Sequence, residues 1–98
     1  MSIRAECAAL SDTLGPATRY FKSVLKDGRF EVRYGTPQDS RYEFWSGNIT
    51  EAGRIEITGE YIEGAGGIKP VSFSGNKTSL GKVASGTRGL RDCDVYFD

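Results

Sequence analysis

The residues whose types and spacing suit a chemical role lie mainly in segment 75–91. This segment carries four basic residues and no acidic one: Lys77, Lys82, Arg88 and Arg91. It is also rich in Gly, Ser and Thr, whose backbone N–H and hydroxyl groups suit an anion. Few sizeable apolar residues interrupt it, so we expect a long polar loop, and loops of this length are commonly functional. The pattern predicts that this basic loop carries whatever specific recognition the protein has.

The composition excludes several kinds of catalysis. The chain contains no histidine, which removes the commonest general base and the commonest metal ligand. Cys7 and Cys93 stand near opposite ends of the chain and form no zinc-binding pattern, so we expect no metal and no cofactor. Free cysteine packs as a small hydrophobe, which favours two buried, reduced thiols. A disulfide between them would require secretion.

Carboxylates offer the remaining route to acid–base chemistry. Glu56 and Glu60 lie on one face of a predicted strand, and Glu43 on its neighbour could face them. A polar row of this kind is also what the solvent face of a one-sided sheet requires. We therefore identify no catalytic residue, and the overall pattern points away from an enzyme. A small histidine-independent enzyme with a carboxylate base is one alternative.

The first quarter of the chain has helical spacing. The positions i, i+4, i+7 and i+11 are apolar: Ile3, Cys7, Leu10 and Leu14. Pro16 bends the pattern or opens a second helical segment. Asp27-Gly28 is typical of a helix end, with the glycine in the left-handed conformation. We expect one bent helix or two short helices here.

After residue 28 the apolar period changes from 3.6 to 2, which indicates strands. Five strands are predicted, at 29–34, 41–49, 54–62, 68–74 and 92–97. Tight turns and the lack of further helices favour antiparallel pairing. The predicted fold is therefore α+β, with the N-terminal helical segment packed on an antiparallel sheet or small barrel of about five strands. The length of 98 residues fits a single domain, 1–98.

Aromatic residues provide a second candidate surface. Trp45 adjoins Phe44, and Tyr61 adjoins Ile62, so only one residue of each pair faces inward on a regular strand. An exposed Trp45 or Tyr61 would be an effective interface anchor. The leading hypothesis is a small non-catalytic binding or protein-interaction module that uses a sheet face and the 75–91 basic loop, with a protein partner or a homodimer. The alternative is binding of an anionic ligand, either nucleic acid or a phosphorylated metabolite, by that loop.

The charge balance and the apolar runs bear on location. Thirteen basic and thirteen acidic residues cancel, so the whole molecule has no net field that would attract it to nucleic acid or to an anionic membrane. The apolar runs are too short to cross a bilayer or to act as a signal peptide. We expect a cytoplasmic protein without a membrane partner.

Overall fold

The computed structural model describes residues 1–64, 66–78 and 81–97, and these residues form eight β-strands and no helix. The strands are β1 Ser2–Cys7, β2 Ala17–Lys22, β3 Arg29–Tyr34, β4 Arg41–Ile49, β5 Arg54–Glu63, β6 Lys69–Thr78, β7 Gly81–Arg88 and β8 Arg91–Phe97. The fold is all-β, so the predicted α+β class is wrong. No helix long and apolar enough to cross a membrane occurs in the described part of the chain.

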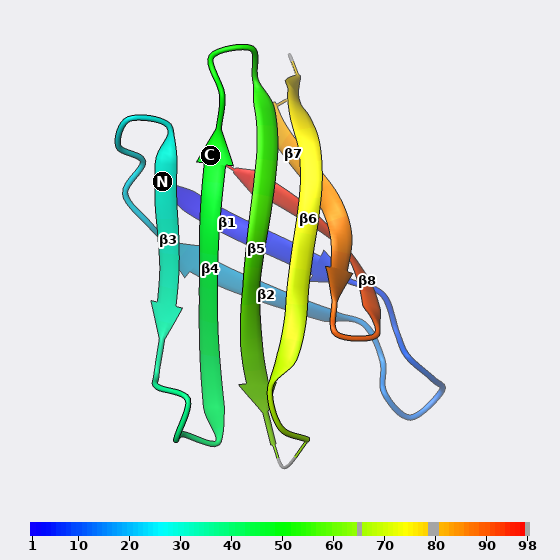
Figure 1. Cartoon of the computed structure of the whole chain (residues 1–98). Helices are drawn as coiled ribbons and strands as arrows, with labels where there is room; N and C mark the ends of the chain where they lie inside the picture. The colour runs from blue at the N-terminus through cyan, green and yellow to red at the C-terminus, as the bar shows by residue number, and fades with distance from the viewer. Residues whose placement is uncertain (65, 79–80, 98) are drawn as a thin grey trace.

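The strands form one antiparallel sheet in the order β2-β1-β8-β7-β6-β5-β4-β3. Strands that are consecutive in sequence pair with each other, apart from β2 and β3, which do not. In addition, β1 pairs with β8. The sheet curls into a nearly closed barrel with its single opening between β2 and β3. In Figure 1, β3 to β6 lie side by side, and β1, β2 and β8 cross behind them at a steep angle.

The N-terminal segment forms strands because its burial follows a period of two. Ile3, Ala5 and Cys7 are buried and alternate with exposed residues along β1. A spacing of four, as between Ile3 and Cys7, places two residues on the same side of either a helix or a strand. Ala5, midway between them, is also buried on that side, which is the pattern of a strand. Leu10 and Leu14, which would complete a helical stripe, are 44% and 54% exposed in the β1–β2 connection.

Asp27-Gly28 is a turn between extended segments and not a helix end. Both residues have positive φ, 53° and 76°, as the two-residue turn of a hairpin requires. Lys26 and Arg29 exchange two backbone hydrogen bonds of 2.9 Å across this turn. Asp-Gly is a strong hairpin signal when the flanking segments are extended.

The predicted basic loop is also regular structure. Segment 75–91 contains the end of β6, all of β7 and the start of β8. Small residues permit the close packing of these strands: Cβ atoms at Gly75 and Gly86 would overlap the backbone of the neighbouring strand. The polar composition that suggested a loop therefore belongs to strands whose outer face is exposed to solvent. Strands at the other predicted positions agree with β3, β4, β5, β6 and β8 within a few residues.

The barrel interior is filled with side chains. Trp45 is fully buried, and its ring lies 4.9 Å from that of Phe21 on β2 and 5.2 Å from that of Phe73 on β6. Ile55 and Ile57 of β5 are also fully buried. Because these side chains occupy the centre, an internal site can exist only toward an end of the barrel.

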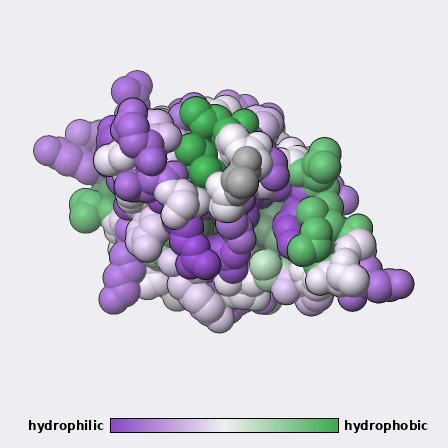
Figure 2. All heavy atoms as spheres, turned by 90° about the horizontal axis from the view of Figure 1, so that it is seen from below, coloured by the Kyte–Doolittle hydropathy of each residue, from purple (hydrophilic) through white to green (hydrophobic). Residues whose placement is uncertain are grey.

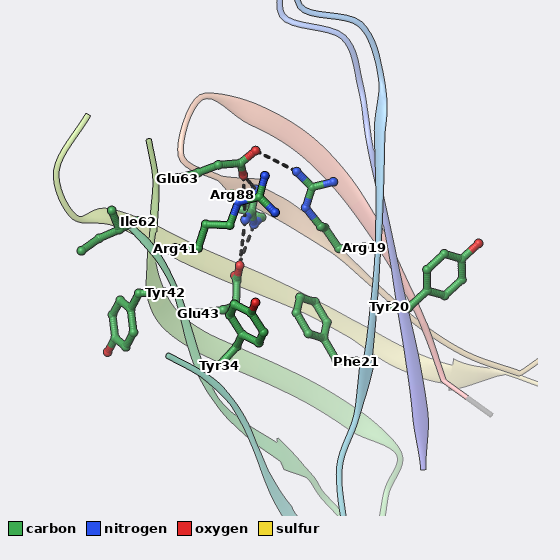
Figure 3. Close-up of a pocket in the computed structure, with 10 residues that line it drawn as sticks. All are labelled: Arg19, Tyr20, Phe21, Tyr34, Arg41, Tyr42, Glu43, Ile62, Glu63 and Arg88. Carbon is green, nitrogen blue, oxygen red and sulfur yellow. Dashed lines mark hydrogen bonds and ion pairs between the residues drawn. The ribbon is translucent and has the colours of Figure 1, made fainter. Parts of the chain in front are cut away.

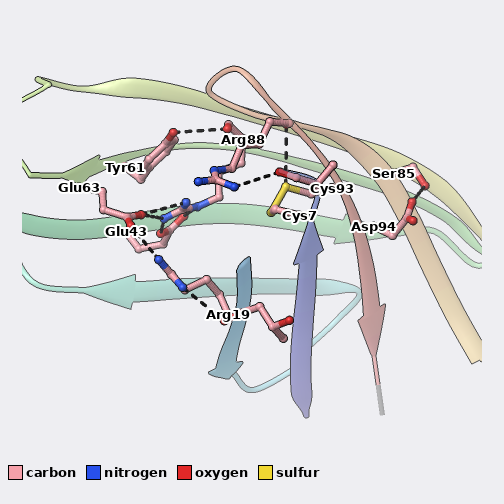
Figure 4. The surroundings of a disulfide bond; sticks show 12 residues. Cys7, Arg19, Glu43, Tyr61, Glu63, Ser85, Arg88, Cys93 and Asp94 are labelled. Carbon is pink, nitrogen blue, oxygen red and sulfur yellow. Dashed lines mark hydrogen bonds and ion pairs between the residues drawn. A yellow bond between two sulfur atoms is a disulfide. The ribbon is translucent and has the colours of Figure 1, made fainter. Parts of the chain in front are cut away.

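A disulfide bond joins β1 to β8. Cys7 and Cys93 are direct cross-strand partners, with Cα atoms 4.0 Å apart, and their sulfur atoms are bonded (Figure 4). The backbone hydrogen bond from Ala8 N–H to Asp92 O places the cysteines at the neighbouring non-hydrogen-bonded position, where side chains approach most closely. The expectation of two reduced thiols is wrong, although both residues are buried as predicted.

Candidate functional site

The opening of the barrel is a seam between the edge strands β2 and β3. At one end the seam is closed, because the Ser23 hydroxyl just beyond β2 donates a hydrogen bond to the backbone oxygen of Glu31 on β3. Toward the other end the strands diverge, and a cavity of about 200 Å³ lies between them. Ten residues line this seam cavity: Arg19, Tyr20, Phe21, Tyr34, Arg41, Tyr42, Glu43, Ile62, Glu63 and Arg88.

The alternation of the strands decides which side chains face into the seam cavity. On β4, Arg41, Glu43 and Trp45 share one face, and Trp45 is in the core, so Arg41 and Glu43 also face inward. The side chains of Tyr42 and Ile62 point the other way, as Figure 3 shows. The inward set comprises Arg19, Phe21, Tyr34, Arg41, Glu43, Glu63 and Arg88.

A buried ion pair forms the floor of the seam cavity. The Arg88 guanidinium from β7 donates two hydrogen bonds to the Glu43 carboxylate, at 2.7 and 3.2 Å. The Trp45 indole N–H donates a third, at 2.6 Å. Arg88 is 4% exposed and Glu43 5% exposed, so both charges are removed from water and depend on each other. Burial works to lower the pKa of Arg88, but the hydrogen bonds and negative charges of Glu43 and Glu63 outweigh it, and the net shift is upward.

Glu63 extends this ion pair to the wall of the cavity. Its carboxylate accepts hydrogen bonds from Arg88 at 3.2 Å and from Arg19 at 2.7 Å, which links β5 to β7 and to the edge strand β2. Burial works to raise the pKa of Glu63, but the charges of Arg19 and Arg88 outweigh it and hold the pKa below 4.5. This network links the edge strand β2 to the buried ion pair across the seam cavity.

The ring of Tyr61 supports the guanidinium of Arg88. The guanidinium carbon lies 3.8 Å from the ring centre, a cation–π contact, and the Tyr61 hydroxyl donates to the backbone oxygen of Arg88 at 3.3 Å. Burial raises the pKa of the Tyr61 hydroxyl. Tyr61 is thus a structural support beneath the cavity and not an exposed anchor.

Arg41 differs from the other two arginines of the cavity. It faces Glu63 across the β4–β5 pair, but among the described residues it forms no ion pair within 4 Å. The inward set has three arginines and two glutamates, 3 − 2 = +1 in formal charge. Arg19 and Arg88 are neutralised by the glutamates, so the excess positive charge belongs to Arg41. Figure 3 shows the side chains of Arg19, Arg41 and Arg88 gathered near Glu63.

The structure separates the residues that the sequence singled out. Lys77 is exposed on β6, and the side chain of Lys82 lies outside the described part of the protein. Arg91 anchors the β1–β2 connection, donating to the backbone oxygens of Ala8 at 2.9 Å and Gly15 at 2.7 Å. Trp45 is fully buried and Tyr61 is 5% exposed, so neither offers a surface in this state. Among the described side chains of this set, Arg88 contacts Tyr61 directly and shares the Glu43 carboxylate with Trp45, and only Arg88 lines the seam cavity.

Sequence reasoning missed the other charged residues of the cavity. Arg19 lies in the segment that was expected to be helical, Arg41 begins the strand predicted at 41–49, and Glu63 follows the strand predicted at 54–62, so nothing indicated that they meet. Glu43 stands two residues from Trp45 and therefore shares its face of β4, which could have indicated that Glu43 is buried. Tyr42 and Phe44 make the opposite face equally apolar, so the sequence does not show which face points inward.

The described residues include no group of three or more His, Cys, Asp and Glu side chains that could hold a metal ion. Comparisons of the chain with protein-family models, with curated proteins and with solved structures found no match.

Proposed function

We propose that this protein is a small non-catalytic binding module and that its seam cavity holds an anionic group of the ligand. The observation that carries the proposal is Arg41, a cation at the cavity without an ion-pair partner among the described residues. An arginine in this position is suited to a carboxylate or phosphate, which it can bind through two parallel hydrogen bonds.

The rest of the cavity is consistent with binding. Both inward glutamates are already held by arginines, which favours a rigid, preorganised wall over proton transfer. Phe21 and Tyr34 provide aromatic surface beside the charged groups. A volume of about 200 Å³ accommodates one small group and no large ligand.

A titration with benzoate tests the proposal, and benzamide serves as its neutral isostere. Benzoate should shift the NMR amide signals of Arg19, Phe21 and Tyr34, while benzamide should leave them nearly unchanged. Arg41→Gln should weaken benzoate binding about tenfold, because it removes one charge-assisted contact. Lys77→Gln is the matched control, since Lys77 is exposed on β6 and does not line the cavity.

Failure of benzoate to bind would contradict the proposal, and so would two other results. Equal binding of benzoate and benzamide would mean that charge is not recognised. Loss of binding in Lys77→Gln but not in Arg41→Gln would move anion recognition to the basic residues of segment 75–91, the site that the sequence alone favours.

The disulfide bears on the expected cytoplasmic location. Disulfide bonds form and persist in oxidising compartments and are rare in reducing ones. The Cys7–Cys93 bond therefore favours a location with oxidising conditions. Thiol labelling of the protein in its native cells, with and without prior reduction, would distinguish the two locations.

A further inference from the structure

The outer edge of β2 presents unpaired backbone groups to the seam. Met1 and Ser23 exchange two hydrogen bonds of 2.9 Å, so the odd-numbered residues of this strand bond to β1. The even-numbered ones, Thr18, Tyr20 and Lys22, consequently direct their N–H and C=O groups into the seam. Among the described residues the contact made there is that of the Arg19 guanidinium with the Thr18 oxygen, at 3.4 Å.

The facing edge of β3 is partly covered. The hydrogen bond from Ile49 N–H to Gly28 O shows that even-numbered residues bond to β4, so odd-numbered ones face the seam. The backbone N–H and C=O groups of Arg29 are hydrogen-bonded to the backbone of Lys26, and the backbone oxygen of Glu31 accepts a hydrogen bond from the Ser23 hydroxyl. The open part of the seam is therefore limited to the divergent end, where the seam cavity lies.

A strand added to the edge of β2 would send alternate side chains into this cavity. Residues opposite Arg19 and Phe21 would share their inward face, while residues opposite Tyr20 would point outward. An inward acidic side chain opposite Arg19 would lie on the wall that also holds Arg41. The excess positive charge of the cavity matches such a residue.

We propose that the seam captures an extended peptide segment of a protein partner by strand addition to β2, with an acidic side chain of the segment in the seam cavity. This rests on the proposed function, because the acidic side chain supplies the anionic group. Backbone hydrogen bonds to Thr18 and Tyr20 at the open end of the seam provide affinity, and the cavity provides selectivity, as in other cases of strand addition. Tyr20, which is 74% exposed, lies on the outer face of the edge and can contact the partner.

The surface around the seam fits an acidic segment better than an apolar one. Figure 2 shows the molecule from below, and this face is mostly hydrophilic, with apolar groups in separate patches. The exposed large hydrophobic residues are distributed over several connections, including Leu14, Val24, Ile68 and Leu90. Among the described residues the exposed hydrophobic side chains are thus dispersed, whereas charge and unpaired backbone groups coincide at the seam.

The test uses the peptide acetyl-Ser-Val-Ser-Glu-Ser-Val-Ser-amide with the full chain, followed by NMR. We expect it to shift the amide signals of Thr18 and Tyr20 and to slow hydrogen exchange at Tyr20. It should bind at least tenfold more tightly than acetate, which supplies the carboxylate alone. Replacing the peptide glutamate by glutamine should weaken binding about tenfold.

Two N-methylated peptides isolate the backbone contribution. Methylation at the serine that follows the glutamate removes an N–H that faces β2 and should weaken binding at least fivefold. Methylation at the glutamate itself modifies an N–H that faces away from β2 and should change binding less than twofold. Equal effects of the two methylations would overturn strand addition.

The remaining outcomes are distinguishable. If benzoate binds but the peptide binds no more tightly than acetate, the anion site stands and the peptide proposal fails. If benzoate also fails to bind, the proposed function fails with it. If the β2 amide signals instead shift with protein concentration alone, the occupant of the edge is a second copy of this chain, and the proposal of an acidic partner segment is overturned.

Discussion

Removing Arg88 tests the energetic description of the cavity floor. In Arg88→Met the Glu43 carboxylate loses two hydrogen bonds of 2.7 and 3.2 Å and keeps that from Trp45. Glu43 is 5% exposed, so water cannot replace the lost partner. Breaking a buried pair in this way costs about 3–5 kcal/mol, because one charge stays buried and uncompensated. That is a large share of the roughly 5–15 kcal/mol that stabilises a typical domain.

The assay is equilibrium unfolding in urea with the disulfide intact. With a slope of about 1–3 kcal/mol per molar urea, the midpoint should fall by about 2 M. Arg54→Met is the matched control: Arg54 forms a surface pair with Glu56 at 3.0 Å, and its loss should change stability by less than about 1 kcal/mol.

A double variant identifies the origin of the loss. Glu43→Gln in the Arg88→Met background removes the uncompensated charge and keeps an acceptor for the Trp45 indole, so it should recover about half of the lost stability or more. If Arg88→Met costs less than about 1 kcal/mol, or if the double variant is no more stable than the single one, the explanation by a buried, uncompensated charge is wrong.

The other predictions concern acid stability and the disulfide. The pKa of Glu63 is lower in the folded protein than its ordinary 4.5, so its contribution to stability is present above that pH and is lost as the pH falls through the folded value. Unfolding free energies measured from pH 7 to pH 3 should therefore fall less steeply in Glu63→Gln, and parallel curves would contradict this. The double replacement Cys7→Ala and Cys93→Ala should lower stability by about 2–5 kcal/mol in urea unfolding, since the bond closes a long loop. Adding a thiol reductant should affect only the parent protein, and equal sensitivity of both would refute the assignment.

Five of the six strands after residue 28 could be predicted, because their apolar residues alternate with polar ones; β7 could not, because its residues are mostly small and polar. The first quarter could not, because Ile3 and Cys7 stand four residues apart, a spacing that both a helix and a strand satisfy. Asp27-Gly28 was equally ambiguous, since the same dipeptide ends helices and forms hairpin turns. In both places tertiary pairing decided the local structure.

The candidate site was harder to predict than the strands. Its central contact joins Glu43 to Arg88, which are 45 residues apart in the chain. Nothing in the sequence shows that β4 and β7 bring these residues together across the barrel. Segment 75–91 is basic, as the sequence shows, but two of its cations are engaged in internal contacts. Arg88 forms this ion pair, and Arg91 donates hydrogen bonds to the β1–β2 connection. Charge counted along a sequence does not distinguish a buried arginine from an exposed one.

The disulfide has a mechanical consequence. Cys7 and Cys93 are separated by 86 positions in sequence, yet they are joined near the two ends of the chain, and Ile3 pairs with Phe97 beside them. Tension applied to those ends would peel residues 1–6 from β2 and β8, and residues 94–97 from β7, and would then load the sulfur–sulfur bond, so that the chain between the two cysteines would bear no force. Reduction would release about 300 Å of additional contour length on stretching. In a single-molecule pulling experiment, the oxidised barrel should therefore appear almost inextensible and the reduced one should unfold.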